Sequence, residues 1–232
     1  MSLFNLFKKR PVFVEMTGPL VIIIMGPQGS GKGTQGELLK KHFDIPLITV
    51  GQMLRDEIKK NTSLSATIAS YINKGSILPD HLTNEIVRKR LLESDTHKGY
   101  ILDGYPRDME QTIYFNNLAK PTLVILLDIP HDETMRRLGG RRVCADCKLN
   151  FNIATLDQGV TKCTKCGGKL EARADDVPEI IEKRLGIYEK ETMPVINFYK
   201  KMGVTKKIDG VGTPRDVWKR ILKVVPKKEH HP

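Results

Sequence analysis

Residues Gly26-Pro-Gln-Gly-Ser-Gly-Lys-Gly-Thr34 directly follow the apolar run Leu20–Met25 and precede the helix-like stretch Gln35–His42. A strand, a glycine-rich loop and a helix in this order cradle phosphates, because backbone N–H groups converge in the loop and the helix N-terminus adds partial positive charge. Lys32 adds a full positive charge. The spacing matches the nucleotide-binding loop, although Gly33 stands where Ser or Thr usually follows the lysine. The stretch predicts binding of a nucleoside triphosphate.

Outside this loop, short apolar runs alternate with helical patterns. The expected strands are Leu20–Met25, Leu47-Ile48, Tyr100–Leu102, Leu123–Leu127 and Val204–Ile208. The expected helices are Lys32–His42, Gly51–Lys59, Ser63–Lys74, His81–Leu92, Asp108–Leu118, His131–Leu138, Glu179–Lys201 and Pro214–Val224. This alternation predicts an α/β fold with a parallel sheet covered on both faces. We expect Asp108 and Thr213 to cap the helices that follow them.

Two segments interrupt the alternation. Between Gly51 and Pro79 two helical patterns follow each other without a strand, which predicts a small helical insertion. Between Arg141 and Ala172 the chain has glycines, four cysteines and little helical periodicity. Irregular insertions of that length are usually functional, and lids over a binding site are the common case.

The cysteines form two pairs, Cys144-Ala-Asp-Cys147 and Cys163-Thr-Lys-Cys166. Two such pairs at this separation have the spacing of a four-thiolate zinc ribbon, in which each pair presents two thiolates to a tetrahedral ion. Four protein ligands leave no open position for water, so we interpret the metal as structural. Two disulfides and uncombined thiols are the alternatives, and the spacing does not separate zinc from iron.

Composition limits the function further. The 232-residue chain can bury a substantial core and carries a formal net charge of +11. The basic residues are scattered along the chain, which favours solvated helix faces and nucleotide phosphates over a nucleic-acid surface. No run of 18 apolar residues indicates a membrane span, and the N-terminus lacks the order of a signal peptide. We therefore expect a cytoplasmic enzyme.

Together these features resemble adenylate kinase, a nucleoside monophosphate kinase, in the long-lid form that contains zinc. The resemblance runs from about Leu20 to Val224 and rests on several motifs in the order of that family. They are Gly26–Gln35, Gly51-Gln-Met-Leu-Arg55, Asp103-Gly-Tyr-Pro-Arg107 with Gln111, Gly140-Arg-Arg142, Arg173-Ala-Asp-Asp176, Lys183-Arg184 and Asp209-Gly210. Each motif alone could be a coincidence, and the set is specific.

The resemblance implies a P-loop kinase fold with a five-stranded parallel sheet and helices on both faces. It also implies reversible, Mg²⁺-dependent phosphoryl transfer from ATP to AMP, which yields two ADP and serves adenine nucleotide homeostasis. The implied division is an N-terminal extension at 1–19, a core at 20–49, 80–140 and 174–224, a nucleoside monophosphate-binding domain at 50–79, a zinc-binding lid at 141–173 and a C-terminal tail at 225–232.

The resemblance also assigns residues to the donor, ATP. The catalytic set is Lys32, Asp103, Arg107, Arg141, Arg173 and Arg184, in which Asp103 orients water on magnesium. The ATP-binding set is Gly29, Ser30, Gly31, Lys32, Gly33, Thr34, Arg137, Arg141, Asn150, Phe151 and Gly212. Arginine suits this chemistry because its planar guanidinium stays charged and grips phosphate oxygens in two places. Asp175 and Asp176 are expected to hold the lid arginines when the lid is closed.

A second set is assigned to the acceptor, AMP. It contains Val50, Arg55, Ser76, Ile77, Leu78, Gly104, Tyr105, Pro106, Arg107, Gln111, Arg173 and Arg184. Gln111 matches the glutamine that reads the acceptor adenine in the family. Two residues depart from the family pattern. Val50 replaces a threonine near the acceptor, and Gln52 replaces an aspartate that helps to organise the magnesium shell, so we expect weaker magnesium dependence or lower activity than in relatives.

Three alternatives stay open. The acceptor could be another nucleoside monophosphate, or the donor could be GTP. A more distant alternative is a zinc-ribbon ATPase that binds nucleic acid, but Phe151 is the one aromatic residue near the cysteines that could stack on bases.

The N-terminal residues 1–10 could form a short amphipathic segment, and we expect a tail or a packed strand there without membrane contact. A monomer without a nucleic-acid partner is the expectation.

Overall fold

The computed structural model describes residues 18–153, 156, 159–173 and 176–226. The strands are β1 (Leu20–Met25), β2 (Leu47–Thr49), β3 (Gly99–Asp103), β4 (Leu123–Asp128), β5 (Arg141–Cys144), β6 (Asn150–Asn152), β7 (Leu170–Glu171) and β8 (Thr205–Asp209). The helices are α1 (Lys32–Phe43), α2 (Val50–Ile58), α3 (Ser63–Asn73), α4 (Asp80–Leu91), α5 (Met109–Leu118), α6 (His131–Gly139), α7 (Pro178–Ile187), α8 (Met193–Lys201) and α9 (Pro214–Ile221). The N-terminal residues 1–17, with the proposed amphipathic segment, and Asp175 lie outside the described residues.

Five strands form a central parallel sheet in the order β2-β3-β1-β4-β8. β1 lies in the middle, where Ile22 pairs with Ile101 of β3 on one side and with Leu123 of β4 on the other. The predicted five-stranded parallel sheet is confirmed. Because all strands run in one direction, the loops that leave their carboxyl ends gather at one edge, and ligands bind at this edge in open α/β sheets.

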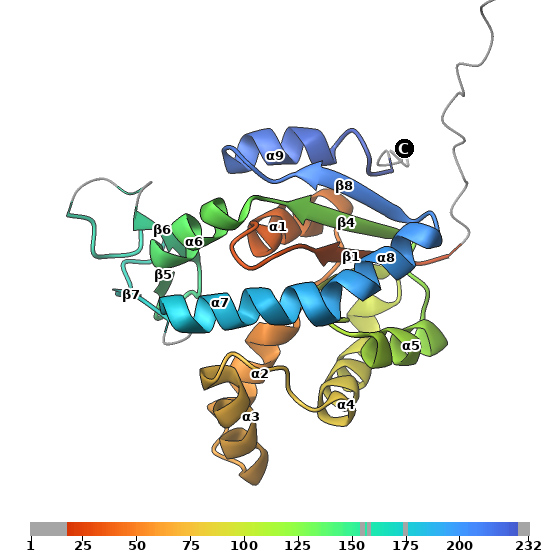
Figure 1. Ribbon diagram of the computed structural model, residues 1–232, viewed down its shortest axis with the longest axis horizontal. Coiled ribbons are helices and arrows are strands. Elements are labelled where there is room, and N and C mark those ends of the chain that lie inside the picture. Colours follow the sequence, from red (N-terminus) through yellow and green to blue (C-terminus); the bar gives the residue numbers. More distant parts are fainter. Residues whose placement is uncertain (1–17, 154–155, 157–158, 174–175, 227–232) are drawn as a thin grey trace, which may run out of the picture.

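The alternating side chains of β1 enter two separate cores. Val21 and Ile23 pack with residues of α4, α5 and α8 on one face of the sheet. Ile22 and Ile24 pack with residues of α1 and α9 on the other. Figure 1 shows the sheet between these two helical layers. The sequence of β1 is an unbroken apolar run because helices cover both faces of the strand.

The sequence predicted one helix over Glu179–Lys201, and the structure corrects this. α7 and α8 are separated by a π-helical turn at Tyr188–Thr192. Pro194 is the second residue of α8 and has no backbone N–H to donate to the preceding turn. A π-helical turn accommodates such a missing donor without ending the run of helix, so α7 and α8 follow one course along the molecule (Figure 1).

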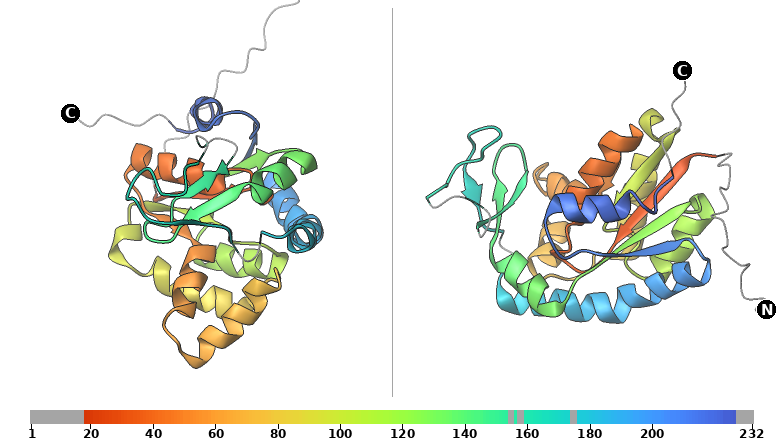
Figure 2. Two further views of the ribbon diagram at one scale, coloured as in Figure 1. Left: turned by 90° about the vertical axis from the view of Figure 1, so that its left-hand side faces the viewer. Right: turned by 90° about the horizontal axis from the view of Figure 1, so that it is seen from above.

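Two smaller units project from the core. Helices α2 and α3 pack on each other below the sheet in Figure 1, and a three-stranded antiparallel sheet in the order β6-β5-β7 carries the cysteines at another end of the molecule. Figure 2 shows this small sheet standing clear of the central one. Of the helices in the described part of the chain, none has the length and apolar character required to cross a membrane.

Candidate active site

The glycine-rich loop lies where β1 ends and α1 begins, at the carboxyl edge of the sheet. Gly26 adopts φ +143°, and a Cβ at this position would lie 2.3 Å from the Leu127 carbonyl oxygen, so only glycine fits. α1 starts after Gly31 with no side-chain cap and no acidic residue in its first turn. Its first N–H groups are therefore available to an anion, as a phosphate site requires.

Lys32 projects back over the loop that precedes it. Its Nζ donates hydrogen bonds to the carbonyl oxygens of Gly26 (2.8 Å) and Pro27 (2.7 Å). Withdrawal of this ammonium group from water lowers the pKa of Lys32 to about 8, against the opposing effect of the Asp103 carboxylate. The neighbouring Arg107 lowers the pKa further. The loop thus holds a desolvated cation, and a bound phosphate would stabilise its charged form.

Asp103 is the last residue of β3 and lies beside the start of α1. A Cβ at Gly33 would be 3.8 Å from its Oδ2, and the residue is 8% exposed. Burial raises the pKa of Asp103, while Lys32 and then Arg107 pull it down. A carboxylate surrounded by cations at the mouth of a phosphate loop fits the magnesium-ordering role, because Mg²⁺ prefers oxygen ligands and keeps several waters.

A large cavity of about 1010 Å³ opens over the loop. Arginines from separate segments line it: Arg55 of α2, Arg107 after β3, Arg137 of α6, Arg141 of β5, Arg173 after β7 and Arg184 of α7. Their sequence positions span 130 residues, from 55 to 184, and the fold brings them to one cavity. Such a concentration of guanidinium groups is suited to several phosphates at once.

Several of these arginines have partners within the protein. Arg141 pairs with both carboxylate oxygens of Asp176, and Nε lies 2.6 Å from Oδ2. Arg184 lies 3.6 Å from the same carboxylate, whose side chain is 3% exposed. Arg107 donates to the carbonyl oxygen of Gly104 at 2.8 Å. A single buried acid thus holds one arginine of the small sheet and one of α7 together.

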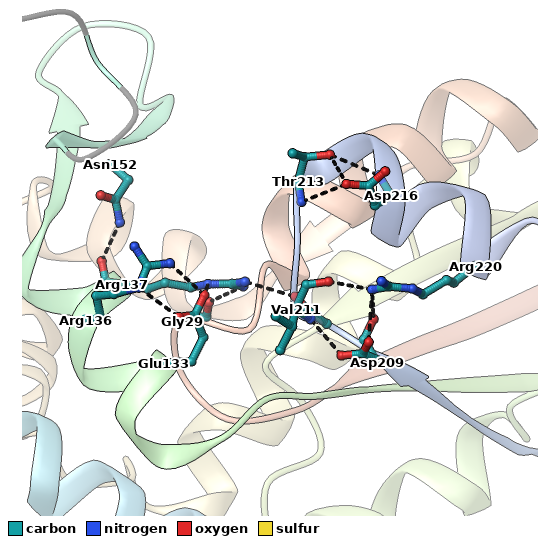
Figure 3. Close-up of polar contacts among 11 residues, drawn as sticks. Gly29, Glu133, Arg136, Arg137, Asn152, Asp209, Val211, Thr213, Asp216 and Arg220 are labelled. Atoms are coloured by element: carbon teal, nitrogen blue, oxygen red, sulfur yellow. Dashed lines mark hydrogen bonds and ion pairs between the residues drawn. The ribbon is translucent and has the colours of Figure 1, made fainter.

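All residues predicted for the donor line the cavity. They are Gly29, Ser30, Gly31, Lys32, Gly33, Thr34, Arg137, Arg141, Asn150, Phe151 and Gly212. Arg137 connects three segments: its NH2 donates to the Gly210 carbonyl (3.0 Å), its NH1 to the Gly29 carbonyl (3.3 Å), and its Nε to Glu133 (2.6 Å). Figure 3 shows this guanidinium lying between the phosphate loop and the loop that follows β8.

The residues predicted for the acceptor divide into two groups. Arg55, Gly104, Tyr105, Pro106, Arg107, Arg173 and Arg184 line the cavity. Val50, Ser76, Ile77, Leu78 and Gln111 are described but do not line it. Val50 and Gln111 are each 1% exposed, and the Ser76 hydroxyl accepts a hydrogen bond from Lys183 at 3.0 Å. The structure therefore brings seven of the residues predicted for the acceptor to the cavity and leaves the other five outside it.

The Gln111 amide is engaged at both ends. Oε1 accepts from the backbone N–H of Arg107 at 2.9 Å, and Nε2 donates to Asp80 at 2.6 Å. Because an N–H can only donate and a carboxylate can only accept, these partners define which end of the amide is oxygen. No local sequence pattern indicates this arrangement, since Asp80 precedes Gln111 by 31 positions.

The cavity also has wall residues that the sequence analysis did not assign to it: Gln35, Thr49, Glu133, Arg136 and Lys148. Glu133 bonds Arg136 and Arg137, three and four positions on, and this helical spacing was a usable signal. The Arg136 hydrogen bond is the leading cause that lowers the pKa of Glu133 to about 2, despite opposing desolvation. Gln52 also lines the cavity, and its Oε1 accepts from Arg55 at 3.1 Å.

The four cysteines converge, as their spacing predicted. Their sulfur atoms all lie within 4.8 Å of one another, and the pairs Cys144–Cys166 and Cys147–Cys163 have Sγ–Sγ distances of 3.4 and 3.6 Å. All four are free thiols, so the disulfide alternative is not found. With Zn–S bonds of about 2.3 Å, the edge of a tetrahedral site is about 3.8 Å. The sulfur positions therefore fit a tetrahedral metal ion.

Comparisons with known proteins agree with this geometry. A family model described as adenylate kinase matches residues 24–204. An adenylate kinase from Clostridium tetani is 38% identical over 212 residues, covering 88% of this chain and 97% of the relative. Adenylate kinases from Caldanaerobacter subterraneus and Staphylococcus aureus are each 39% identical over 210 residues, covering 88% of this chain and 95% and 98% of the relatives. A phosphate loop, an arginine-lined cavity and a four-cysteine cluster thus occur in a chain that belongs to the adenylate kinase family.

Proposed function

We propose that the protein transfers the terminal phosphoryl group of ATP to AMP, reversibly and with magnesium, to give two ADP. The observation that carries this proposal is the cavity in which Lys32 and the arginines of six separate segments surround the phosphate loop. Phosphoryl transfer needs little covalent work from a protein. It needs donor and acceptor in line and a surrounding of cations for the spreading negative charge.

On the donor side, the backbone of Gly29–Thr34 wraps the phosphates and Lys32 bridges the β- and γ-phosphates. Magnesium neutralises the charge on the transferring phosphoryl group when it is bound with ATP. Asp103 would orient water in the shell of the bound magnesium, and Thr34 also lines the cavity. Asn150 and Phe151 reach the donor from β6, and Arg137 lies along its base.

On the acceptor side, Arg55, Arg107, Arg173 and Arg184 grip the phosphate of AMP. Arg107 and Arg173 lie close enough to influence the Asp103 carboxylate, so this phosphate lies next to the donor's γ-phosphate. Gln111 and residues 76–78 bind the adenine once residues 50–79 close on the cavity. Since Gln111 and residues 76–78 do not line the cavity, binding of the adenine requires this closure.

Closure also protects ATP. Water in the cavity would accept the phosphoryl group in place of AMP, and a site that shuts over both nucleotides excludes it. Residues 141–173 form the lid that supplies Arg141 and Arg173, and the four cysteines hold structural zinc that shapes this lid. We expect a cytoplasmic monomer that sustains the balance of adenine nucleotides.

A coupled assay on the zinc-loaded, purified chain tests the proposal. ADP should form from ATP with AMP far faster than with UMP, CMP or GMP, and ATP should be preferred over GTP as donor. Lys32→Met should remove nearly all activity while leaving zinc content and circular dichroism unchanged. Absence of ADP formation from ATP and AMP would overturn the proposal, and a preference for another monophosphate would reassign the acceptor.

A further inference from the structure

Asp80 is the first residue of α4, and its half-buried side chain reaches α5. Its Oδ1 accepts a hydrogen bond from Nε2 of Gln111 at 2.6 Å. One turn along the same helix, Asn84 accepts from the Tyr105 hydroxyl at 2.7 Å, and both of these side chains are buried. Figure 1 shows α4 and α5 side by side. Two successive turns of α4 therefore make polar contacts with the segment around Gln111.

A backbone group holds the other end of the Gln111 amide. The N–H of Arg107 donates to Oε1 at 2.9 Å, and the carbonyl oxygen of the same residue accepts from the Thr192 hydroxyl at 2.7 Å. The backbone N–H of Gln111 donates to the Asp108 carboxylate at 2.9 Å. The amide thus lies between an acceptor on α4 and a donor in a peptide that is itself held by the fold.

Two hydrogen-bonding groups of this amide are left over. A glutamine amide has two N–H hydrogens and two oxygen lone pairs. Asp80 takes one N–H and Arg107 takes one lone pair, and among the described residues Nε2 and Oε1 have no other partner. Gln111 is 1% exposed, and buried polar groups are normally paired. One N–H and one lone pair, adjacent on the same amide, therefore remain for a ligand.

The chemistry of purine bases makes the orientation of this amide decisive. In adenine, N1 accepts a hydrogen bond and the amino group at C6 donates one. In hypoxanthine and guanine, N1 carries a hydrogen and donates, and the oxygen at C6 accepts. The remaining N–H and lone pair of Gln111 match adenine in the orientation that the structure shows. An amide turned over would match the other two bases.

The carboxylate at position 80 opposes the turned amide. A carboxylate can only accept, so turning the amide would place Oε1 against the Asp80 oxygen and Nε2 against the Arg107 N–H. An asparagine at position 80 accepts or donates equally well and sets no such preference. The charge also has a cost, because the Asp80 carboxylate adds to the effect of burial that raises the pKa of Asp108 to about 6.

We propose that Asp80 is a positioning residue for recognition of the acceptor base. By holding Nε2 of Gln111 it fixes the orientation of the amide, which selects AMP over IMP and GMP. This inference rests on the proposed function, because the base meets Gln111 only after the closure of residues 50–79 described there. Asp80 itself touches no nucleotide.

The test compares Asp80→Asn with Glu85→Gln in the zinc-loaded full chain. Asp80→Asn keeps the shape of the side chain. Glu85 lies on the same helix, is exposed and pairs with Arg88 and Lys89, so its substitution removes the same charge away from Gln111. Initial rates with AMP and with IMP as acceptors, at saturating ATP, give the kcat/KM ratio of the two. Asp80→Glu keeps a group that can only accept and tests conservative rescue.

In Asp80→Asn we expect KM for AMP to rise and the AMP-to-IMP ratio of kcat/KM to fall by about three- to tenfold, while KM for ATP stays within twofold. Asp80→Glu should retain more of the ratio than Asp80→Asn, and Glu85→Gln should leave it unchanged. An unchanged AMP-to-IMP ratio in Asp80→Asn, or an equal rise in the KM values for AMP and ATP, overturns the inference.

A double-mutant cycle tests whether Asp80 acts through Gln111. Gln111→Leu removes the amide, so adding Asp80→Asn to it should not change the AMP-to-IMP ratio further. A further fall of the ratio in the double variant, as large as in Asp80→Asn alone, also overturns the inference. If the unaltered chain makes no ADP from ATP and AMP, the proposed function fails instead.

Discussion

The ammonium group of Lys32 lies within hydrogen-bond distance of two carbonyl oxygens of its own loop, those of Gly26 and Pro27. The same loop withdraws it from water, and this desolvation is the largest cause that lowers its pKa to about 8. The cation is therefore present below about pH 8 and is lost above it, far below the range in which an exposed lysine loses its proton.

The lowered pKa of Lys32 leads to a prediction about how kcat/KM depends on pH. The value of kcat/KM for ATP should fall above about pH 8, because kcat/KM reports ionisations of the free enzyme. Initial rates at low ATP between pH 6 and pH 10 measure it. Lys32→Arg, which stays charged throughout this range, should show lower activity without this inflection. A profile of the unaltered chain that stays flat to pH 10 would contradict the prediction.

Burial shifts the pKa of Asp108 in the opposite direction to that of Lys32, upward. Its carboxylate caps α5 by accepting from the Gln111 N–H at 2.9 Å, as the sequence predicted. Burial is the main cause that raises the pKa of Asp108 to about 6, and the Asp80 carboxylate adds to it, against the Gln111 bond. Since the folded pKa is above the unfolded value, the contribution of Asp108 to stability is full below the unfolded pKa, near 3.8, and is lost as the pH rises through 6.

Asp108→Asn should therefore stabilise the fold at neutral pH. Asparagine caps helices as well as aspartate and carries no charge to desolvate. The free energy of unfolding in urea should rise by roughly 1 kcal/mol at pH 7.5, after allowance for partial exposure, and by well under half of that at pH 4.5. Asp216→Asn is a control of opposite sign, because hydrogen bonds from Thr213 lower the pKa of Asp216. Equal effects of Asp108→Asn at both pH values would refute the argument.

At the scale of elements, we expect the sheet β6-β5-β7 to need a bound metal ion for its stability. Its strands β5, β6 and β7 have four, three and two residues, and the buried residues here include Cys144 of β5 and Cys163 between β6 and β7. Two- and three-stranded sheets of this size have little independent stability. A metal held by four thiolates supplies folding energy to such a unit, roughly 10–16 kcal/mol in small zinc fingers.

Removal of the proposed zinc ion should accordingly unfold this element and leave the core folded. A chelator that strips zinc should open residues 141–173 to protease, reduce ADP formation by more than about tenfold, and leave most of the circular dichroism intact. Readdition of Zn²⁺ should restore protection and activity together. Unchanged protease resistance of this segment in a metal-free sample would show that the cysteines do not hold its shape.

Over the whole molecule, Asp176 connects parts that are distant in the chain. Its buried carboxylate holds Arg141 of β5 and lies 3.6 Å from Arg184 of α7. Both arginines line the cavity, and their like charges would repel each other without the acid between them. The position of the small sheet over the cavity is thus coupled to the core through one side chain.

We predict that movement of these parts, not phosphoryl transfer, limits turnover. Rapid-quench measurements should show a burst of ADP in the first turnover, because product release follows a faster chemical step. Asp176→Asn should slow the chemical step and reduce or abolish the burst, since the arginines lose their common partner. Equal burst-phase and steady-state rates in the unaltered chain would exclude gating by closure.

Much of the fold was predictable from local patterns. The runs Leu20–Met25 and Leu123–Leu127 became β1 and β4, and Thr213 and Asp108 cap α9 and α5 as expected. The break between α7 and α8 was missed, because helical periodicity continues through Pro194 and a π-helical turn leaves no signal in the apolar pattern. Apolar period and capping depend on neighbours within one or two turns, which the sequence displays directly.

The amino-acid sequence by itself determined the phosphate loop, the cysteine cluster and the family, because each is encoded by residues at fixed short spacings. Only the tertiary structure decided which arginines share the cavity, that Asp80 holds Gln111, and that Arg137 joins the phosphate loop to the loop after β8. The physical reason is that these contacts join residues from 31 to 108 positions apart. Their geometry follows from how the helices pack on the sheet, which no local pattern specifies.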